Sequence, residues 1–207
     1  MTIRTINGMR LLISGLGNGG VHAIKPQTGE TVWSFPAAKR AVNTGVVIKG
    51  NTVFMSHGDE NFDTVEMGLI AAFDGSESGT ISTRKWSTTG VKFRTSSPVL
   101  DGDRLYQIDG GGTLHSFDTE TGQEYWTQRL GNAQQAPLVM GDGKLYAGTN
   151  GGSFFIIRPH ADRAEVLSKV TLPLSTNSCC GSEGTPEQIV SGAAISNGRV
   201  FFVSSDA

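Results

Sequence analysis

The sequence predicts an all-β fold, a β-propeller of four-stranded antiparallel blades, and three observations support it. Helical periodicity is nearly absent, and short runs of Val, Ile, Leu, Phe and Tyr alternate with Gly, Asp and Asn clusters. A tight turn followed by an apolar or aromatic pair returns five times. A strand, a turn and a Trp return three times, as GVHAIKPQTGETVW, GLIAAFDGSESGTISTRKW and TLHSFDTETGQEYW. Recurrence at a spacing of tens of residues indicates repeated supersecondary units.

The third repeat shows the expected strands of one blade most clearly. They read SSPVLDG, RLYQID, TLHSFD and QEYWTQRL, and the next repeat opens at QAPLVMGDG. Four antiparallel strands in about 40 residues are the unit of a propeller blade. We therefore expect one partial propeller over residues 1–207, with blades at about 1–36, 37–89, 90–131 and 132–173 and an incomplete fifth blade at 189–207.

Within each repeat, the first two strands are expected to be joined by a two-residue turn. Such dipeptides accept positive φ at little cost. The turns are Asn7-Gly8, Gly50-Asn51, Asp101-Gly102, Asp142-Gly143 and Asn197-Gly198. The matching position of the strand that follows is predicted to hold Leu12, Phe54, Tyr106, Tyr146 and Phe201.

The third and fourth strands carry a motif that resembles the tryptophan-docking repeat of pyrroloquinoline-quinone-type (PQQ-type) propellers, Ala-x-Asp-x-x-Thr-Gly-x-x-x-Trp. The first copy matches at Ala23, Thr28, Gly29 and Trp33, with Lys25 where Asp is usual. The third copy matches at Asp118, Thr121, Gly122 and Trp126, with Ser116 for Ala. The second copy matches at Ala72, Asp74, Gly79 and Trp86 across a four-residue insertion, and in the fourth copy Val166 or Leu167 stands near the Trp position.

The resemblance implies a structural role for the residues that match the motif. A four-stranded blade is too small to bury both faces, and an indole offers a large apolar surface with an N–H for a backbone carbonyl. We expect the following residues to dock neighbouring blades: Trp33, Trp86, Trp126, Gly29, Gly122, Thr28 and Thr121.

Rings of the PQQ type usually have seven or eight blades, so four blades and two strands predict a fragment of a longer chain. An open arc would leave bare strand edges. The N-terminal residues MTIRTINGMRLLISG lack the apolar core of a signal peptide. The resemblance implies a periplasmic or otherwise extracytoplasmic parent protein, with a lipid anchor upstream of this sequence as one means of membrane association.

Composition argues against nucleic-acid binding and against a transmembrane helix. The net charge of −2 gives no basic footprint for nucleic acid. No apolar run approaches the ~20 residues that a transmembrane helix needs. The partner expected from the fold is a protein, bound by a propeller face or by its loops.

Cys179 and Cys180 are adjacent, in the polar stretch LSTNSCCGSEGTPEQIVSG. PQQ-dependent alcohol dehydrogenases, which the repeats resemble, carry a vicinal disulfide over their cofactor, so these cysteines are candidates for cofactor contact. The alternatives are free thiols in a loop and a disulfide that stiffens it. No cofactor is predicted, and PQQ with Ca²⁺ is the alternative.

The segment SHGDENFDTVEMG contains the candidate metal ligands Asp59, Glu60, Asn61 and Asp63, with Glu66 nearby. Dense oxygen ligands suit Ca²⁺, but the spacing does not match an EF-hand, and a solvated loop is the alternative. No His-x-x-x-His pair occurs, so zinc is not indicated, and His57 beside this segment is the histidine to test.

Arg40, Arg94 and the NAQQAP stretch at 132–137 fall at blade entrances, where propeller loops usually line one mouth of the channel. GLGNGG at 15–20 resembles a dinucleotide-binding glycine pattern, but a strand follows it instead of the required helix. We interpret it as a turn.

Two function classes follow. The first is a non-enzymatic protein-interaction scaffold, similar to the propeller lipoprotein of the outer-membrane β-barrel assembly machinery. The second is a fragment of a PQQ-dependent alcohol or sugar dehydrogenase, and a ligand-binding propeller module is a third alternative. No catalytic residue is predicted, because no convergent catalytic set is present in the sequence.

Overall fold

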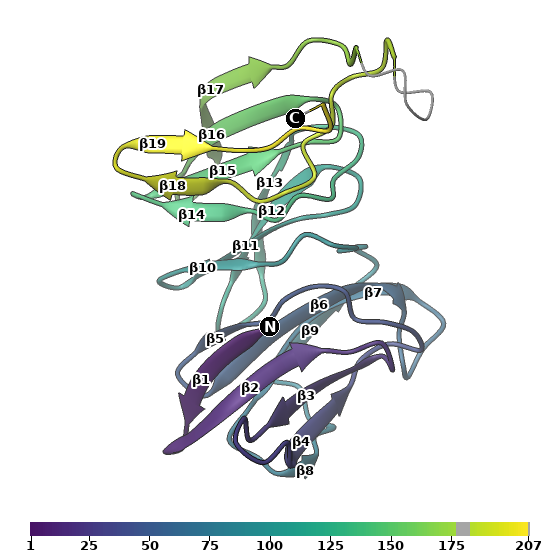
Figure 1. Ribbon diagram of the computed structural model, residues 1–207. Coiled ribbons are helices and arrows are strands. Elements are labelled where there is room, and N and C mark those ends of the chain that lie inside the picture. Colours follow the sequence, from purple (N-terminus) through teal and green to yellow (C-terminus); the bar gives the residue numbers. More distant parts are fainter. Residues whose placement is uncertain (177–182, 207) are drawn as a thin grey trace. The chain divides into compact units, whose positions relative to one another are not determined.

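A computed structural model describes residues 1–176 and 183–206, which form strands and loops without a helix (Figure 1). The predicted all-β class is therefore confirmed. The chain divides into two compact units. Unit 1 comprises Met1–Pro98 and Asp118–Gln123, and unit 2 comprises Val99–Phe117 and Glu124–Ala207. The part of the chain that the structure describes holds no apolar helix of membrane-spanning length.

Unit 1 contains two antiparallel meanders in which consecutive strands pair side by side (Figure 1). The first sheet is formed by β1 (Thr2–Ile6), β2 (Met9–Gly15), β3 (Gly20–Ile24) and β4 (Thr31–Pro36). The second is formed by β5 (Val47–Lys49), β6 (Thr52–Glu60), β7 (Met67–Asp74) and β9 (Trp86–Thr89). Each sheet contains the four antiparallel strands expected of a blade, and the first sheet has β8 (Gly79–Thr80) as a fifth strand.

Unit 2 repeats the same topology twice and adds a hairpin. One sheet is formed by β10 (Val99–Asp101), β11 (Arg104–Ile108), β12 (Thr113–Asp118) and β13 (Glu124–Arg129). The next is formed by β14 (Val139–Gly141), β15 (Lys144–Gly148), β16 (Ser153–Pro159) and β17 (Ala164–Thr171). The hairpin pairs β18 (Ala194–Ser196) with β19 (Arg199–Phe201).

The insertion in the second repeat has a structural use that the sequence did not indicate. In this lengthened segment, the motif glycine Gly79 and the following Thr80 form β8, which pairs in parallel with β4 through Trp33 and Ser34. Ile81 follows, fully buried, and its N–H donates to the Ser34 carbonyl over 2.8 Å. The insertion thus satisfies part of the edge of the first sheet, which would otherwise present unpaired backbone groups.

The turns between the first two strands of each sheet follow the prediction with two corrections. Both turn residues have positive φ at Asn7-Gly8, Asp142-Gly143 and Asn197-Gly198. In the third sheet Asp101 pairs with Arg104, so the turn is Gly102-Asp103, one residue later than predicted. In the first sheet Leu11, not Leu12, stands at the position of Phe54, because the register pairs Ile6 with Met9 and Arg4 with Leu11.

Each unit has its own apolar core. In unit 1 a cluster of buried side chains joins the facing surfaces of the two sheets, with Trp33, Phe35 and Phe73 as its largest members. Phe35 and Phe73 stack with ring centroids 4.3 Å apart. In unit 2 the principal cluster includes Trp126 and Tyr106, whose centroids lie 5.8 Å apart. Burial of these aromatic faces is the main stabilising term available to such small sheets.

Candidate functional site

The three tryptophans occupy equivalent places in their sheets and make equivalent hydrogen bonds. Opposite each indole, on the third strand, lies a small residue of the motif: Ala23, Ala72 or Ser116. Each indole N–H donates to a carbonyl in the turn after the third strand of the next repeat. The acceptors are Gly75 for Trp33 at 2.9 Å, Thr119 for Trp86 at 2.9 Å and His160 for Trp126 at 3.0 Å.

The Thr-Gly turns of the motif differ in what surrounds them. Gly29 and Gly122 have φ of +74° and +72°. A Cβ on Gly122 would lie 2.5 Å from the Trp86 ring, whereas a Cβ on Gly29 would meet nothing within 4 Å. The hydroxyl of Thr121 donates to Asp118 over 2.9 Å, and that of Thr28 accepts the Glu30 N–H over 3.3 Å. The Gly122 turn is therefore a packing surface, and the Gly29 turn is open.

A second repeated glycine was missed in the sequence. It lies at or just before the third strand of each sheet, as Gly19, Gly68, Gly112 and Gly152, with φ between +73° and +85°. A Cβ at these positions would lie 2.0 to 2.7 Å from a backbone oxygen in the segment that leaves the fourth strand. The signal was visible in the sequence as a Gly preceding GVHAI, LIAAF, TLHSF and SFFII.

These glycines position the segments that leave the fourth strands, which we call the entrance segments (37–46, 90–98 and 131–138). In unit 1 the Gly19 carbonyl accepts the N–H groups of Ala37 and Ala38, and the Gly68 carbonyl accepts that of Gly90. Val42 donates to Leu16 over 3.1 Å. The backbone on which Arg40 and Arg94 stand is thus held by hydrogen bonds and by close glycine contacts.

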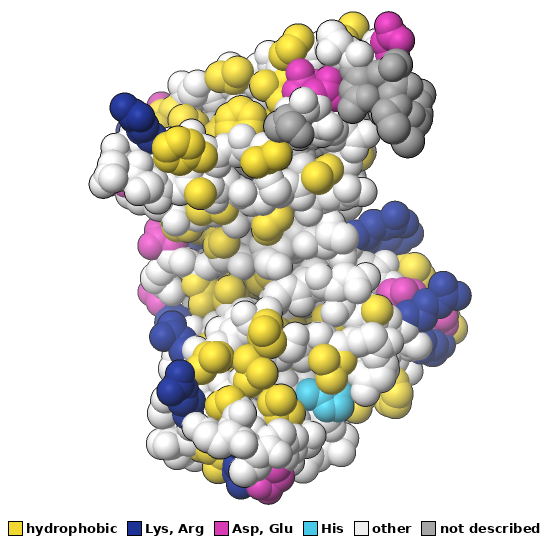
Figure 2. Space-filling view, in the orientation of Figure 1, with side chains coloured by type: hydrophobic (Ala, Val, Ile, Leu, Met, Phe, Trp, Pro, Cys, Tyr) yellow, Lys and Arg dark blue, Asp and Glu magenta, His cyan; other side chains and the backbone are white. Residues whose placement is uncertain are grey.

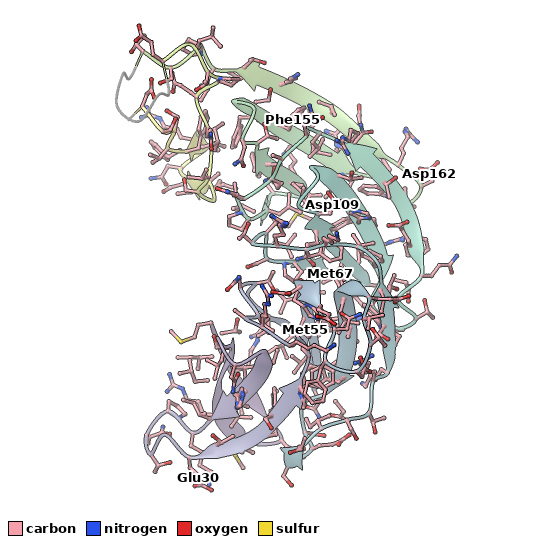
Figure 3. All side chains as sticks on the ribbon, turned by 90° about the vertical axis from the view of Figure 1, so that its right-hand side faces the viewer. Glu30, Met55, Met67, Asp109, Phe155 and Asp162 are labelled. Atoms are coloured by element: carbon pink, nitrogen blue, oxygen red, sulfur yellow. The ribbon has the colours of Figure 1, made fainter. Side chains whose placement is uncertain are left out.

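Unit 1 contains a cavity of about 400 Å³ between its two entrance segments and the adjacent ends of β6 and β7. Arg40 and Arg94, which the sequence placed at blade entrances, both line it. We call it the Arg40–Arg94 cavity, and Figure 3 labels one of its lining residues, Met67, at the start of β7. The lining residues are Arg40, Ala41, Asn43, Gly58, Asp59, Met67, Arg94 and Thr95.

The cations around this cavity differ in their pairing. Lys39 pairs with Glu60 at 2.5 Å, and Arg84 pairs with Asp63 at 2.9 Å. Within residues 1–176 and 183–206, neither Arg40 nor Arg94 forms an ion pair or a side-chain hydrogen bond. Figure 2 shows basic and acidic side chains gathered together beyond the ends of β6 and β7.

The predicted metal ligands are directed to separate protein partners. Besides the two ion pairs of Glu60 and Asp63, an Asp59 oxygen accepts the Glu60 N–H and the Asn61 amide donates to Thr64. Among the described residues, no three His, Cys, Asp or Glu side chains gather as metal ligands would. These side chains therefore do not fit a calcium site as they stand, and we derive no chemistry through Ca²⁺ or PQQ. Cys179 and Cys180 lie outside the described residues.

His57 holds the first entrance segment through a hydrogen bond to its backbone. Its side chain is buried, and its Nε2–H donates to the Ala37 carbonyl over 3.0 Å. Burial lowers the pKa of His57, and the Ala37 carbonyl and the Asp59 carboxylate offset this only in part. The neutral imidazole is thus a structural donor, and it is not among the residues that line the cavity.

Unit 2 contains an ionisable cluster around the buried His115 that the sequence did not predict. His115 on β12 lies 2.5 Å from Glu124 on β13 through Nδ1 and 3.4 Å from Asp109 through Nε2. Asp109, labelled in Figure 3, directly follows β11 and also accepts the N–H groups of Gly111 and Thr113. Burial alone would lower the pKa of His115, but hydrogen bonds to the two carboxylates raise it. Burial alone would raise the pKa of Asp109, but its hydrogen bonds lower it.

The two buried histidines predict opposite pH responses in the two units. The pKa of His115 is raised on folding, so its stabilisation is complete below about pH 6.5 and is lost as the pH rises through the folded pKa. The pKa of His57 is lowered, so unit 1 loses stability as the pH falls below about 6.5. Between pH 8 and 5.5, amide exchange protection, corrected for intrinsic rates, should fall in β6 and β7 and rise in β12 and β13. His115→Asn should abolish the rise in unit 2 alone, and equal trends in both units would contradict the assignment.

Unit 2 has a larger cavity, of about 490 Å³, whose lining holds no charged side chain among the described residues. Of the predicted stretch 132–137, Asn132 and Ala133 reach it. Gln134 is instead buried, and its amide donates to the carbonyls of Ala136 and Gly148 over 2.7 and 2.6 Å. The lining residues are Leu130, Gly131, Asn132, Ala133, Thr149, Asn150, Gly151, Ser153 and Gln188.

The central repeats of the chain match a known protein family. Residues 66–161 match the model of the outer membrane protein assembly factor BamB. Among curated proteins, the tetrathionate hydrolase of Acidithiobacillus ferrooxidans is 25% identical over 135 residues, which are 57% of this chain and 26% of that protein. The chain therefore spans about a quarter of this relative.

Solved structures show the same fold at low sequence identity. BamB from Moraxella catarrhalis superposes with a TM-score of 0.70 at 14% identity, over 100% of this chain and 55% of that one. The WD40 β-propeller domain of Doa1 superposes with a TM-score of 0.64 at 17% identity, over 95% of this chain and 58% of that one. These structures confirm the predicted β-propeller fold, and the family match over residues 66–161 supports the resemblance to PQQ-type repeats. The chain spans just over half of these structures.

Proposed function

We propose that this chain, a set of PQQ-type β-propeller repeats similar to those of BamB, acts as a non-enzymatic protein-interaction scaffold. The observation that carries the proposal is the composition of the surface at the Arg40–Arg94 cavity. Two arginines without ion-pair partners in the described chain share the lining with Met67 at the start of β7. The loop between β6 and β7 adds the exposed apolar side chains of Phe62 and Val65. Phe62, Val65 and Met67 are 57%, 82% and 37% exposed. Arg, Met and aromatic residues are enriched in protein interfaces.

The buried ionisable groups support the same proposal. His57 holds the backbone of an entrance segment, and His115 joins β12 to Asp109 and Glu124. None of these four ionisable side chains lines the Arg40–Arg94 cavity or the cavity of unit 2. A catalytic acid or base must reach a substrate, so the two buried histidines suit packing better than turnover.

We also propose an extracytoplasmic location for the parent protein. Its support is the similarity of residues 66–161 to an outer membrane protein assembly factor. Fractionation of cells that express the full-length gene tests this, and recovery with cytoplasmic markers would overturn it.

The scaffold proposal predicts site-specific crosslinking in cells. A photoreactive phenylalanine at Met67, which is 37% exposed beside the cavity, should give a discrete protein adduct. The matched control is Met9, which is 38% exposed at the turn between β1 and β2 and should give none. The same protein should be assayed with PQQ and Ca²⁺ for dye-linked alcohol oxidation, and separately with tetrathionate. Saturable turnover in either assay, or equal adducts at Met9, would overturn the proposal.

A further inference from the structure

We infer that the Arg40–Arg94 cavity is a carboxylate-binding site that receives an acidic segment of the protein partner. The inference rests on the proposed scaffold function and specifies the chemistry of what is bound. It starts from two arginines that line one cavity and that have no anionic partner among the described residues. Arginine is the side chain best suited to bind a carboxylate with two parallel hydrogen bonds.

The two arginines stand on backbone that is fixed before any ligand binds. Lys39, next to Arg40, donates its N–H to the Glu60 carbonyl over 2.9 Å, and the Gly19 turn packs against the Arg40 carbonyl. On the other side, Gly58 faces Arg94, since a Cβ there would lie 3.0 Å from its Cγ. A preorganised site loses less conformational entropy on binding than one on free loops.

Arg40 and Arg94 differ from several other cations of unit 1 because they form no ion pair among the described residues. Four other cations of the unit are neutralised within the chain: Lys25 by Glu30, Lys39 by Glu60, Lys49 by Glu120 and Arg84 by Asp63. Arg4, Lys85 and Lys92 form no ion pair among the described residues, but none of them lines the cavity. Arg10 has no such partner in the described residues either, but it lies exposed on β2 and lines none of the cavities described above. Arg40 and Arg94 therefore combine unpaired charge with a shared place in the lining of one open cavity, where both side chains are exposed.

Asp59, the third charged residue of the lining, favours a singly charged anion over a multiply charged one. Because Arg40, Arg94 and Asp59 are the charged residues of the lining, the lining carries a net charge of +1. Such a site suits a carboxylate better than a multiply charged phosphate, which Asp59 would repel. Met67 and Ala41 add apolar surface for the methylene groups of an acidic side chain. A volume of about 400 Å³ is within the range of ligand pockets.

The test measures binding of a fluorescent peptide of alternating Glu and Ser by anisotropy at about 0.15 M salt, where nonspecific attraction is screened. The control peptide has Gln in place of Glu. We expect saturable binding of the Glu peptide, a loss of roughly tenfold in affinity for Arg40→Gln or Arg94→Gln, and a larger loss in the double variant. Arg10→Gln removes the same charge from β2 and should change the affinity less than twofold, whereas Asp59→Asn should strengthen binding. Unchanged thermal midpoints will show that the variants fold.

Several results would overturn the inference. They are equal binding of the Gln peptide, an equal loss with Arg10→Gln, absence of peptide binding, and stronger competition by inorganic phosphate than by free Glu peptide. Competition by acetate at the same concentration as the peptide would assign the site to free small carboxylates instead of a partner segment. If the Met67 adduct persists in the double arginine variant, the scaffold proposal stands and the carboxylate inference fails. If the peptide binds while the Met67 adduct is absent, the carboxylate site stands and the scaffold proposal fails.

Discussion

Replacing Gly68 with alanine is expected to destabilise unit 1 by about 2–5 kcal/mol, enough to unfold a marginally stable unit. Gly68 has φ of +85°, and a Cβ would lie 2.1 Å from the Val91 carbonyl oxygen. The left-handed conformation alone costs an L-residue about 1–2 kcal/mol, and overpacking adds about 1–3 kcal/mol. The clash cannot be relieved by a rotamer change, because the obstructing atom belongs to the backbone of an entrance segment.

The matched control is Gly8→Ala in the same unit. Gly8 has φ of +76°, but a Cβ there meets nothing within 4 Å, so only the conformational cost of about 1–2 kcal/mol is expected. Urea unfolding and amide exchange in β6 and β7 should separate the two variants. A Gly68 variant no less stable than the Gly8 variant would show that the close approach of the entrance segment does not constrain the fold.

The sheets could be predicted because their signals are local. Each strand is short, each turn uses Gly with Asn or Asp, and the motif returns with every blade. The errors arose where neighbouring residues offer the same signal. Leu11 and Leu12 are identical, and a one-residue shift exchanges the two faces of a strand. Likewise, Asp101-Gly102-Asp103 contains two candidate turns, and only the pairing of Asp101 with Arg104 decides between them.

The candidate site was predicted only in part, because charge pairing depends on long-range contacts. Arg40 and Arg94 were placed at entrances from the order of the strands alone. The oxygen-rich loop indicated a metal, but the cations that pair with Glu60 and Asp63 lie 21 residues away along the chain in opposite directions. The cluster of His115, Asp109 and Glu124 could not be predicted from the sequence for a related reason. Asp109 and Glu124 approach His115 from the two neighbouring strands, β11 and β13, and no spacing within one strand reveals that arrangement.

Truncation of Trp33 to alanine is expected to destabilise unit 1 by about 3–5 kcal/mol. The indole is fully buried, packs edge-on to Phe73 at 5.5 Å and donates to the Gly75 carbonyl of the second repeat over 2.9 Å. The truncation therefore removes apolar contact in the core of unit 1 and leaves a buried acceptor unpaired. Phe62→Ala removes an aromatic ring that is 57% exposed, and should change stability by no more than about 0.5 kcal/mol.

Trp33→Phe separates the two contributions of the indole to unit 1. Phenylalanine keeps most of the apolar contact with Phe73 but cannot donate to Gly75, so a loss of about 1–3 kcal/mol is expected from the unpaired carbonyl. The loss should be localised, because the second repeat is joined to the first through this bond. Amide exchange should therefore accelerate in the turn that contains Gly75 and in β8, which pairs with Trp33 through Gly79. If Trp33→Phe and Trp33→Ala destabilise unit 1 equally, the hydrogen bond accounts for the whole effect. If Trp33→Ala costs less than about 1 kcal/mol, the proposed docking role of the indole is wrong, because a buried ring that joined two repeats could not be removed so cheaply.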